Sequence, residues 1–127
     1  MGRRCTQMKE VKFYKTASGK IVVALSNPSD ALDEMRELKG NSTDGALEKH
    51  VPVVKKEGGK IIVDVGEVAH PMLDVHYIEF IALLSEERGL EVAFLKPGEA
   101  PHAEFAEVKG GTVYEYCNLH GLWKKEF

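Results

Sequence analysis

The sequence has few cysteines, no basic block and no long apolar run, and each absence excludes a class of protein. Two cysteines in 127 residues are too few for the disulfide framework of a secreted domain, so we expect a reducing compartment. The net charge of -3 is spread over mixed signs, which disfavours nucleic acid and anionic membranes as partners. No stretch approaches the ~20 apolar residues of a membrane span, and the first residues lack the apolar core of a secretion signal. We therefore expect a cytoplasmic protein.

The length and composition suit one main domain with a small appendage. With 43% hydrophobic residues, the chain can bury one core, but a second full domain does not fit. Residues 39–45 are rich in turn formers, which is typical of a joint between two units. We expect an appendage at residues 1–40 and a main domain at residues 41–127.

Two local patterns stand out in the appendage. Val11–Leu25 contains two β-prone runs around the small-residue turn Thr16–Gly19, which predicts a hairpin. Further on, apolar residues recur at helical spacing among charges, which favours a short helix from Asp30 to Leu38 capped by Ser29.

The main domain reads as a series of short strands. β-branched and aromatic runs recur about every 8 to 12 residues between turn formers, with no long helical pattern, which predicts an antiparallel β-sandwich. Pro52 cannot donate a ladder hydrogen bond, so its strand should lie at an edge. The expected strands are Val51–Lys55, Lys60–Val65, Tyr77–Leu84, Leu90–Leu95, Ala103–Val108 and Thr112–Tyr116.

Five potential metal ligands lie at the ends of these strands. Cys117 and His120 form a Cys-x-x-His pair at the close of the final expected strand, and such a pair alone is weak evidence. His50, His70 and His76 stand at strand ends upstream, so the loops of one sandwich could bring all five together. Structural zinc usually takes four ligands, whereas four imidazoles and one thiolate suit an iron centre with one open position. An open position implies a reaction.

Simpler interpretations apply to single residues. Any one of these histidines could be an ordinary core or turn residue. We interpret His102 as a surface residue and Cys5 as an incidental free thiol, because neither has candidate ligands beside it. Tyr116 and Trp123 are typical of core aromatics.

Taken together, these residues resemble the superoxide reductases, and in particular desulfoferrodoxin. The correspondence runs from about Gly40 to Trp123, and its separate motifs follow in the right order and spacing. They are Ser42–Val53, Gly66–Met72 with His76, Phe94–Gly98 and Glu115–Trp123.

The resemblance implies a fold, a site and a reaction. It implies an immunoglobulin-like β-sandwich that reduces superoxide to hydrogen peroxide at one mononuclear non-haem iron. The implied metal ligands are four equatorial imidazoles and one axial thiolate: His50, His70, His76, His120 and Cys117. Lys49 would attract the anion and help to supply a proton, and Glu48 would be a sixth ligand in the ferric state. Outside such a site, both would be solvated surface charges. The amides of Leu119 and His120 would donate hydrogen bonds to the Cys117 sulfur.

The appendage departs from the family pattern. Desulfoferrodoxin carries a second iron there on four cysteines, but the similar segment Tyr14–Ile21 has none, and Asp30-Ala31 stands about where an adjacent cysteine pair would be. The resemblance thus implies a relict desulforedoxin-like unit without metal. It also makes Met35–Leu38 strand-like, against the helical spacing. It further implies a homodimer and an external electron donor such as rubredoxin.

Two alternative functions remain at the level of sequence. One is a non-catalytic structural metal module, with zinc the expected metal. The other is an electron-transfer or iron-buffering protein, whose iron would be six-coordinate in both oxidation states.

Overall fold

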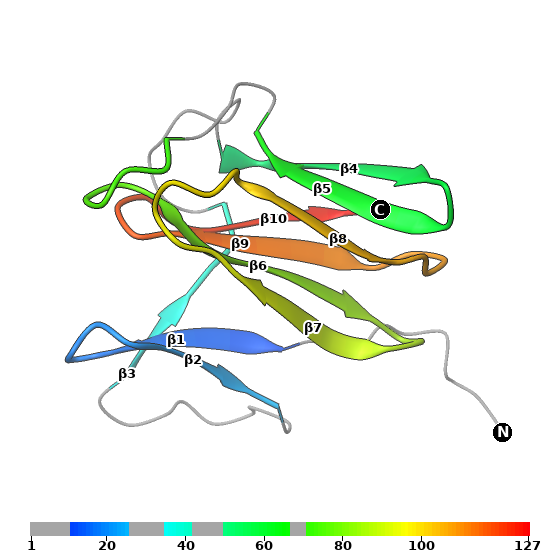
Figure 1. Cartoon of the computed structure of the whole chain (residues 1–127). Helices are drawn as coiled ribbons and strands as arrows, with labels where there is room; N and C mark the ends of the chain where they lie inside the picture. Colours follow the sequence, from blue (N-terminus) through cyan, green and yellow to red (C-terminus); the bar gives the residue numbers. More distant parts are fainter. Residues whose placement is uncertain (1–10, 26–34, 42–49, 67–70) are drawn as a thin grey trace, which may run out of the picture.

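Antiparallel strands make up most of the protein (Figure 1). The structure is a computed structural model that describes residues 11–25, 35–41, 50–66 and 71–127. Within these ranges, no helix is long and apolar enough to cross a bilayer.

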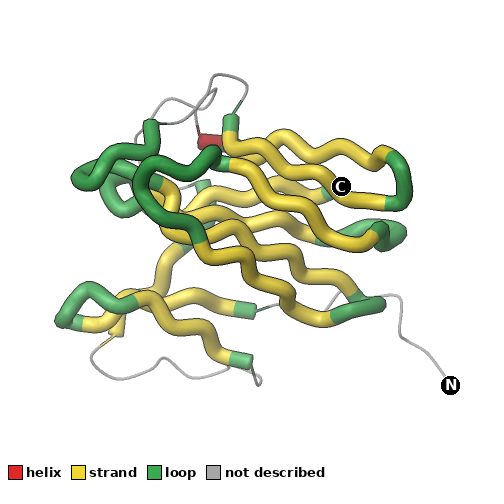
Figure 2. Tube along the Cα trace, in the orientation of Figure 1, coloured by secondary structure: helices red, strands yellow, loops and turns green. Residues whose placement is uncertain are grey.

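Ten strands in the described ranges form three antiparallel sheets (Figure 2). The N-terminal sheet has the order β2-β1-β3, with β1 Lys12–Thr16, β2 Ile21–Ala24 and β3 Met35–Leu38. A three-stranded sheet has the order β4-β5-β8, with β4 Pro52–Glu57, β5 Lys60–Val65 and β8 His102–Ala106. A four-stranded sheet has the order β10-β9-β6-β7, with β6 Ile78–Ser85, β7 Gly89–Phe94, β9 Thr112–Cys117 and β10 Gly121–Glu126.

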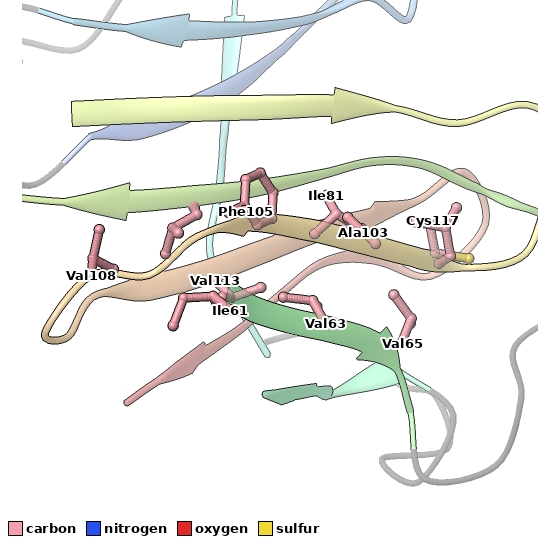
Figure 3. Packing of buried hydrophobic residues seen from close by; sticks show 11 residues of the cluster. Ile61, Val63, Val65, Ile81, Ala103, Phe105, Val108, Val113 and Cys117 are labelled. Atoms are coloured by element: carbon pink, nitrogen blue, oxygen red, sulfur yellow. The ribbon is translucent and has the colours of Figure 1, made fainter. Parts of the chain in front are cut away.

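The two larger sheets form the sandwich that the sequence predicts. Alternate residues of β5, namely Ile61, Val63 and Val65, are buried and point toward the four-stranded sheet (Figure 3). They pack against residues of β6, β8 and β9, and Cys117 belongs to the same cluster. A four-plus-three antiparallel sandwich is typical of immunoglobulin-like domains, so the prediction of an all-β sandwich is confirmed.

The four-stranded sheet is buried on its other face as well. All six residues of β9 are buried, because a second apolar cluster covers the face away from the sandwich core. In that cluster Phe13 of β1 lies 5.9 Å from Phe80 and 4.9 Å from Tyr114, measured between ring centroids. The N-terminal sheet is therefore a third layer, packed through aromatic side chains on the centre of the sandwich.

Most strand predictions hold, and two need correction. The hairpin and the six main-domain strands appear with boundaries within two residues of those predicted, and β4 with Pro52 lies at a sheet edge. The strand β10 was not predicted, because the last strand expected from the sequence was Thr112–Tyr116. Its run Gly121–Glu126 mixes apolar and charged residues, and pairing with β9 is what extends it.

The predicted helix is wrong where the structure can test it. Met35–Leu38 is strand β3, which pairs with β1 so that Leu38 lies opposite Phe13. Leu38 packs against the second apolar cluster, and this tertiary contact overrides a helical spacing of only a few apolar residues. Ser29 and residues 30–34 lie outside the described part of the chain.

His102 is partly exposed, as expected for a surface residue, and it is well paired. Its Nδ1 lies 2.8 Å from a carboxylate oxygen of Asp64, and its Nε2 lies 3.0 Å from Glu104. Lys60 lies 3.0 Å from the same Glu104 carboxylate. The hydrogen bonds that His102 donates to Asp64 and to Glu104 raise its pKa, in that order of size, and burial opposes them.

This pairing predicts a pH-dependent contribution to stability. Because the pKa of His102 is raised in the folded protein, the contribution is complete below the unfolded value of 6.5 and is lost as the pH rises through the folded value. Urea unfolding of the parent and of His102→Gln should therefore differ more at about pH 5.5 than at about pH 8.5. A difference that does not change with pH would refute the pairing.

Removing the Phe13 ring should weaken the packing of the N-terminal sheet on the four-stranded sheet. Phe13→Ala leaves a cavity among Phe80, Tyr114 and their neighbours, so we expect a loss of about 3 to 4 kcal/mol in the free energy of unfolding. Leu25→Ala, at an exposed position of the same N-terminal unit, should stay within about 0.5 kcal/mol. Equal losses for the two variants in denaturant titrations would contradict the packing described.

Candidate metal centre

Three separate segments place donor side chains at one end of the sandwich. His50 directly precedes Val51 and β4, and His76 lies in the loop before β6. Cys117 ends β9, and His120 lies in the turn to β10. Cys117 pairs with Ile78 of β6 and Gly121 of β10, which draws the β6 loop and the β9–β10 turn to the same end of the sheet (Figure 1).

The donor atoms of these four residues form a tight group. One ligand atom from each of His50, His76, Cys117 and His120 lies within 4.8 Å of the others. His50 Nε2 is 3.0 Å from His120 Nδ1, and Cys117 Sγ is 3.7 Å from that same nitrogen. The His120 ring stands edge-on to the His50 and His76 rings, with centroids 4.7 and 5.0 Å away. The three imidazoles and the thiol thus converge on one small volume.

Trp123 and Asn118 hold this arrangement in place. The Trp123 indole stacks on the His50 ring at 4.9 Å, and its Nε1 donates a hydrogen bond of 3.1 Å to the carbonyl of His120. The Asn118 side chain accepts from the Tyr77 amide at 2.9 Å and donates to the Val75 carbonyl at 3.1 Å. Contacts of this kind orient metal ligands before the metal arrives. Trp123 is a core aromatic, as expected, and it also positions two histidines.

The Cys117 thiol is buried and tuned by its surroundings. Burial raises its pKa, while hydrogen bonds from the backbone amides of Leu119 and His120 oppose that effect. The sequence reading expected these two amide donors. A bound cation would remove the thiol proton, because the thiolate is the form that binds metal.

Glu115 is the residue near the site that the sequence reading missed. It is fully buried on the same face of β9 as Cys117, and among the described residues neither carboxylate oxygen has a hydrogen-bond partner. Burial raises the pKa of Glu115 well above its usual value, which favours the protonated form of the carboxyl group. Its place two residues before Cys117, in a strand of alternating faces, was the available signal.

The donor set fits a transition metal. Two donors about 2.1 Å from one ion and at a right angle to each other lie about 3.0 Å apart, which matches the separation of His50 Nε2 and His120 Nδ1. Imidazole with thiolate suits iron or zinc and does not suit magnesium or calcium. Of the five predicted ligands the structure brings four together. His70 lies outside the described residues, as do Glu48 and Lys49.

Comparisons with known proteins agree with the site. A family model described as desulfoferrodoxin matches residues 42–126. The chain is 48% identical over 124 residues to the desulfoferrodoxin of Desulfarculus baarsii, covering 93% of this chain and 98% of that protein. It is 51% identical over 94 residues to the desulfoferrodoxin of Clostridium acetobutylicum, covering 74% of each. The superoxide reductase structure from Treponema pallidum matches with a TM-score of 0.74 and 31% identity, over 92% of this chain and 99% of that one.

Metal binding should stabilise the fold through these four residues. A ferrous salt added without oxygen at about 100 times its Kd should raise the free energy of unfolding by about 2.7 kcal/mol. His76→Ala and Cys117→Ala should each lose most of that gain, whereas His102→Ala, at a histidine away from the group, should keep it. An undiminished thermal shift in Cys117→Ala would show that the metal binds elsewhere.

Proposed function

Because the chain belongs to the desulfoferrodoxin family, we propose that it is a superoxide reductase with one mononuclear non-haem iron. The proposed ligands are His50, His70, His76, Cys117 and His120. The observation that carries the proposal is the convergence of three imidazoles and a buried thiol within 4.8 Å at one end of the sandwich. Reduction of superoxide takes one electron and two protons and yields hydrogen peroxide.

The chain's own residues prepare this chemistry. Iron, when bound, supplies the electron and keeps one coordination position open to a small anion. The Cys117 thiolate donates electron density to the metal, and the amides of Leu119 and His120 moderate that donation. Trp123 fixes the positions of His50 and His120 through ring stacking and a hydrogen bond, so these side chains need to move little during turnover.

Two charged neighbours of His50 in the sequence complete the proposal. Lys49 attracts superoxide and helps to deliver a proton through water, since a single cation acts over a Debye length of about 8 Å at physiological salt. Glu48 would supply a sixth ligand to the iron in its ferric state. Glu48→Ala would then change the ferric spectrum and leave the ferrous one alone.

The electron comes from outside the chain. The N-terminal unit, residues 1–40, contains Cys5 as its single cysteine, so it cannot build a four-thiolate iron and is proposed to be a relict desulforedoxin-like unit beside the catalytic domain, residues 41–127. A cytoplasmic protein such as rubredoxin is the proposed donor. The proposed location is the cytoplasm, because two cysteines are too few for the disulfide framework of a secreted domain. Cell fractionation with an antibody against the chain tests that location.

We also propose a homodimer. A groove of about 590 Å³ between the β1–β2 hairpin and β6–β7 is lined largely by apolar residues, and Phe94 at its border is 82% exposed. A second copy would bury this surface. Sedimentation velocity should show a dimer that Phe94→Asp converts to a monomer, and a monomeric parent would exclude the proposal.

Cys117→Ser tests the iron–thiolate assignment. The oxidised parent should show a thiolate-to-iron charge-transfer band that reductant bleaches and a superoxide pulse restores, with hydrogen peroxide released. The variant should lack the band. A colourless iron-loaded parent that ignores superoxide would instead favour the structural zinc module.

Lys49→Ala tests electrostatic attraction of the substrate. Pulse radiolysis at low salt should show a second-order rate constant reduced by about 10-fold, with a flatter dependence on ionic strength. The visible spectrum should stay as in the parent, because Lys49 is not a ligand. An unchanged rate constant would remove Lys49 from the mechanism.

A further inference from the structure

Three exposed apolar side chains lie on the loops that carry the metal ligands. Leu73 is 62% exposed, Val75 74% and Leu119 60%. Leu73 and Val75 precede His76 in the loop before β6, and Leu119 stands between Cys117 and His120 in the β9–β10 turn. We call these three side chains the apolar rim.

The apolar rim is fixed to the metal centre by its backbone. The amides of Leu73 and His76 each donate to the other's carbonyl, at 2.9 and 3.0 Å. The Val75 carbonyl accepts from Asn118, the residue between Cys117 and Leu119. The rim thus belongs to the same hydrogen-bonded unit as His76 and Cys117, and a partner that covers it lies beside the ligands.

The size of the rim distinguishes between kinds of partner. Exposed apolar residues that gather in one place commonly mark an interaction site. Three such side chains offer roughly 300 Å² of surface, whereas a stable interface buries about 800 Å² on each partner. Among the described residues, the rim alone offers less surface than a stable dimer buries, and its size suits the brief encounters of electron-transfer proteins.

We propose that the apolar rim is the docking surface for the protein that returns an electron to the metal centre. This inference rests on the proposed function. The partner is a small one-electron carrier whose redox centre lies beneath an apolar face of its own. It loses one electron, the ferric iron gains that electron, and no atom is transferred. Contact at the rim brings the two centres as close as the loops allow, and electron transfer slows steeply with distance.

Binding can be measured without turnover. The zinc-loaded protein, labelled with ¹⁵N, is titrated with zinc-loaded rubredoxin as the probe. Zinc is used in both proteins because it has no unpaired electrons to broaden the amide signals. The largest amide shifts should fall at Leu73, Val75 and Leu119. Shifts centred on β7 around Phe94 would instead place the carrier on the proposed dimer groove and overturn the inference.

Kinetics supply the second test. In stopped flow, Leu73→Ser/Val75→Ser should slow reduction of the ferric protein by reduced rubredoxin about 10-fold. The rates at which ascorbate reduces this variant and at which it reacts with a superoxide pulse should equal those of the parent. Leu25→Ser, which removes an apolar residue 64% exposed in the N-terminal unit, should have no effect.

The outcomes separate this inference from the function it rests on. An unchanged rubredoxin rate in Leu73→Ser/Val75→Ser would overturn the docking surface, and the superoxide reaction of the parent would stand. If ascorbate also reduced the variant more slowly, the substitutions would be disturbing the iron itself. That result would also overturn the docking surface. A parent that does not react with superoxide would refute the proposed function instead. A dimer that becomes a monomer on loss of the rim would assign the surface to self-association.

Discussion

The antiparallel pairing of β9 with β6 on one side and β10 on the other is the constraint on which the site depends. It sets Cys117 opposite Ile78 and Gly121, so that the loop with His76 and the turn with His120 meet beside the thiol. His50 joins them from the other sheet, at the entry to β4, where the Trp123 indole of β10 meets it. Candidate metal ligands far apart in the sequence are thus brought within 4.8 Å of one another by strand register. A metal that binds there would need to spend little of its binding energy on ordering the loops.

The N-terminal sheet has a packing role on the sandwich. Because β9 and β6 are apolar on both faces, the four-stranded sheet needs a cover on the side away from the sandwich core. The N-terminal sheet supplies it through Phe13, Ile21, Val23 and Leu38. This packing role uses side chains of the strands and needs no metal.

The sequence was informative where chemistry and strand periodicity coincide. Lys60–Val65 alternates clearly, and its boundaries were predicted correctly. The four ligands at strand ends were found because imidazole and thiol have few roles in common besides metal binding. Three features escaped. Leu38 is held in a strand by Phe13, β10 is extended by β9, and Glu115 is buried by strand parity. The first two depend on a partner distant in sequence, which no local pattern contains, whereas the spacing of Glu115 from Cys117 could have indicated the third. His70, Glu48 and Lys49 stay predictions, since they lie outside the described residues.

The central claim is that one iron ion sits among four imidazole nitrogens and a single thiolate sulfur. X-ray absorption at the iron edge of the reduced, iron-loaded protein measures this ligand shell directly. The account predicts one sulfur scatterer, contributed by Cys117, with imidazole scattering from four histidines. A shell without sulfur, or one dominated by oxygen, would contradict it.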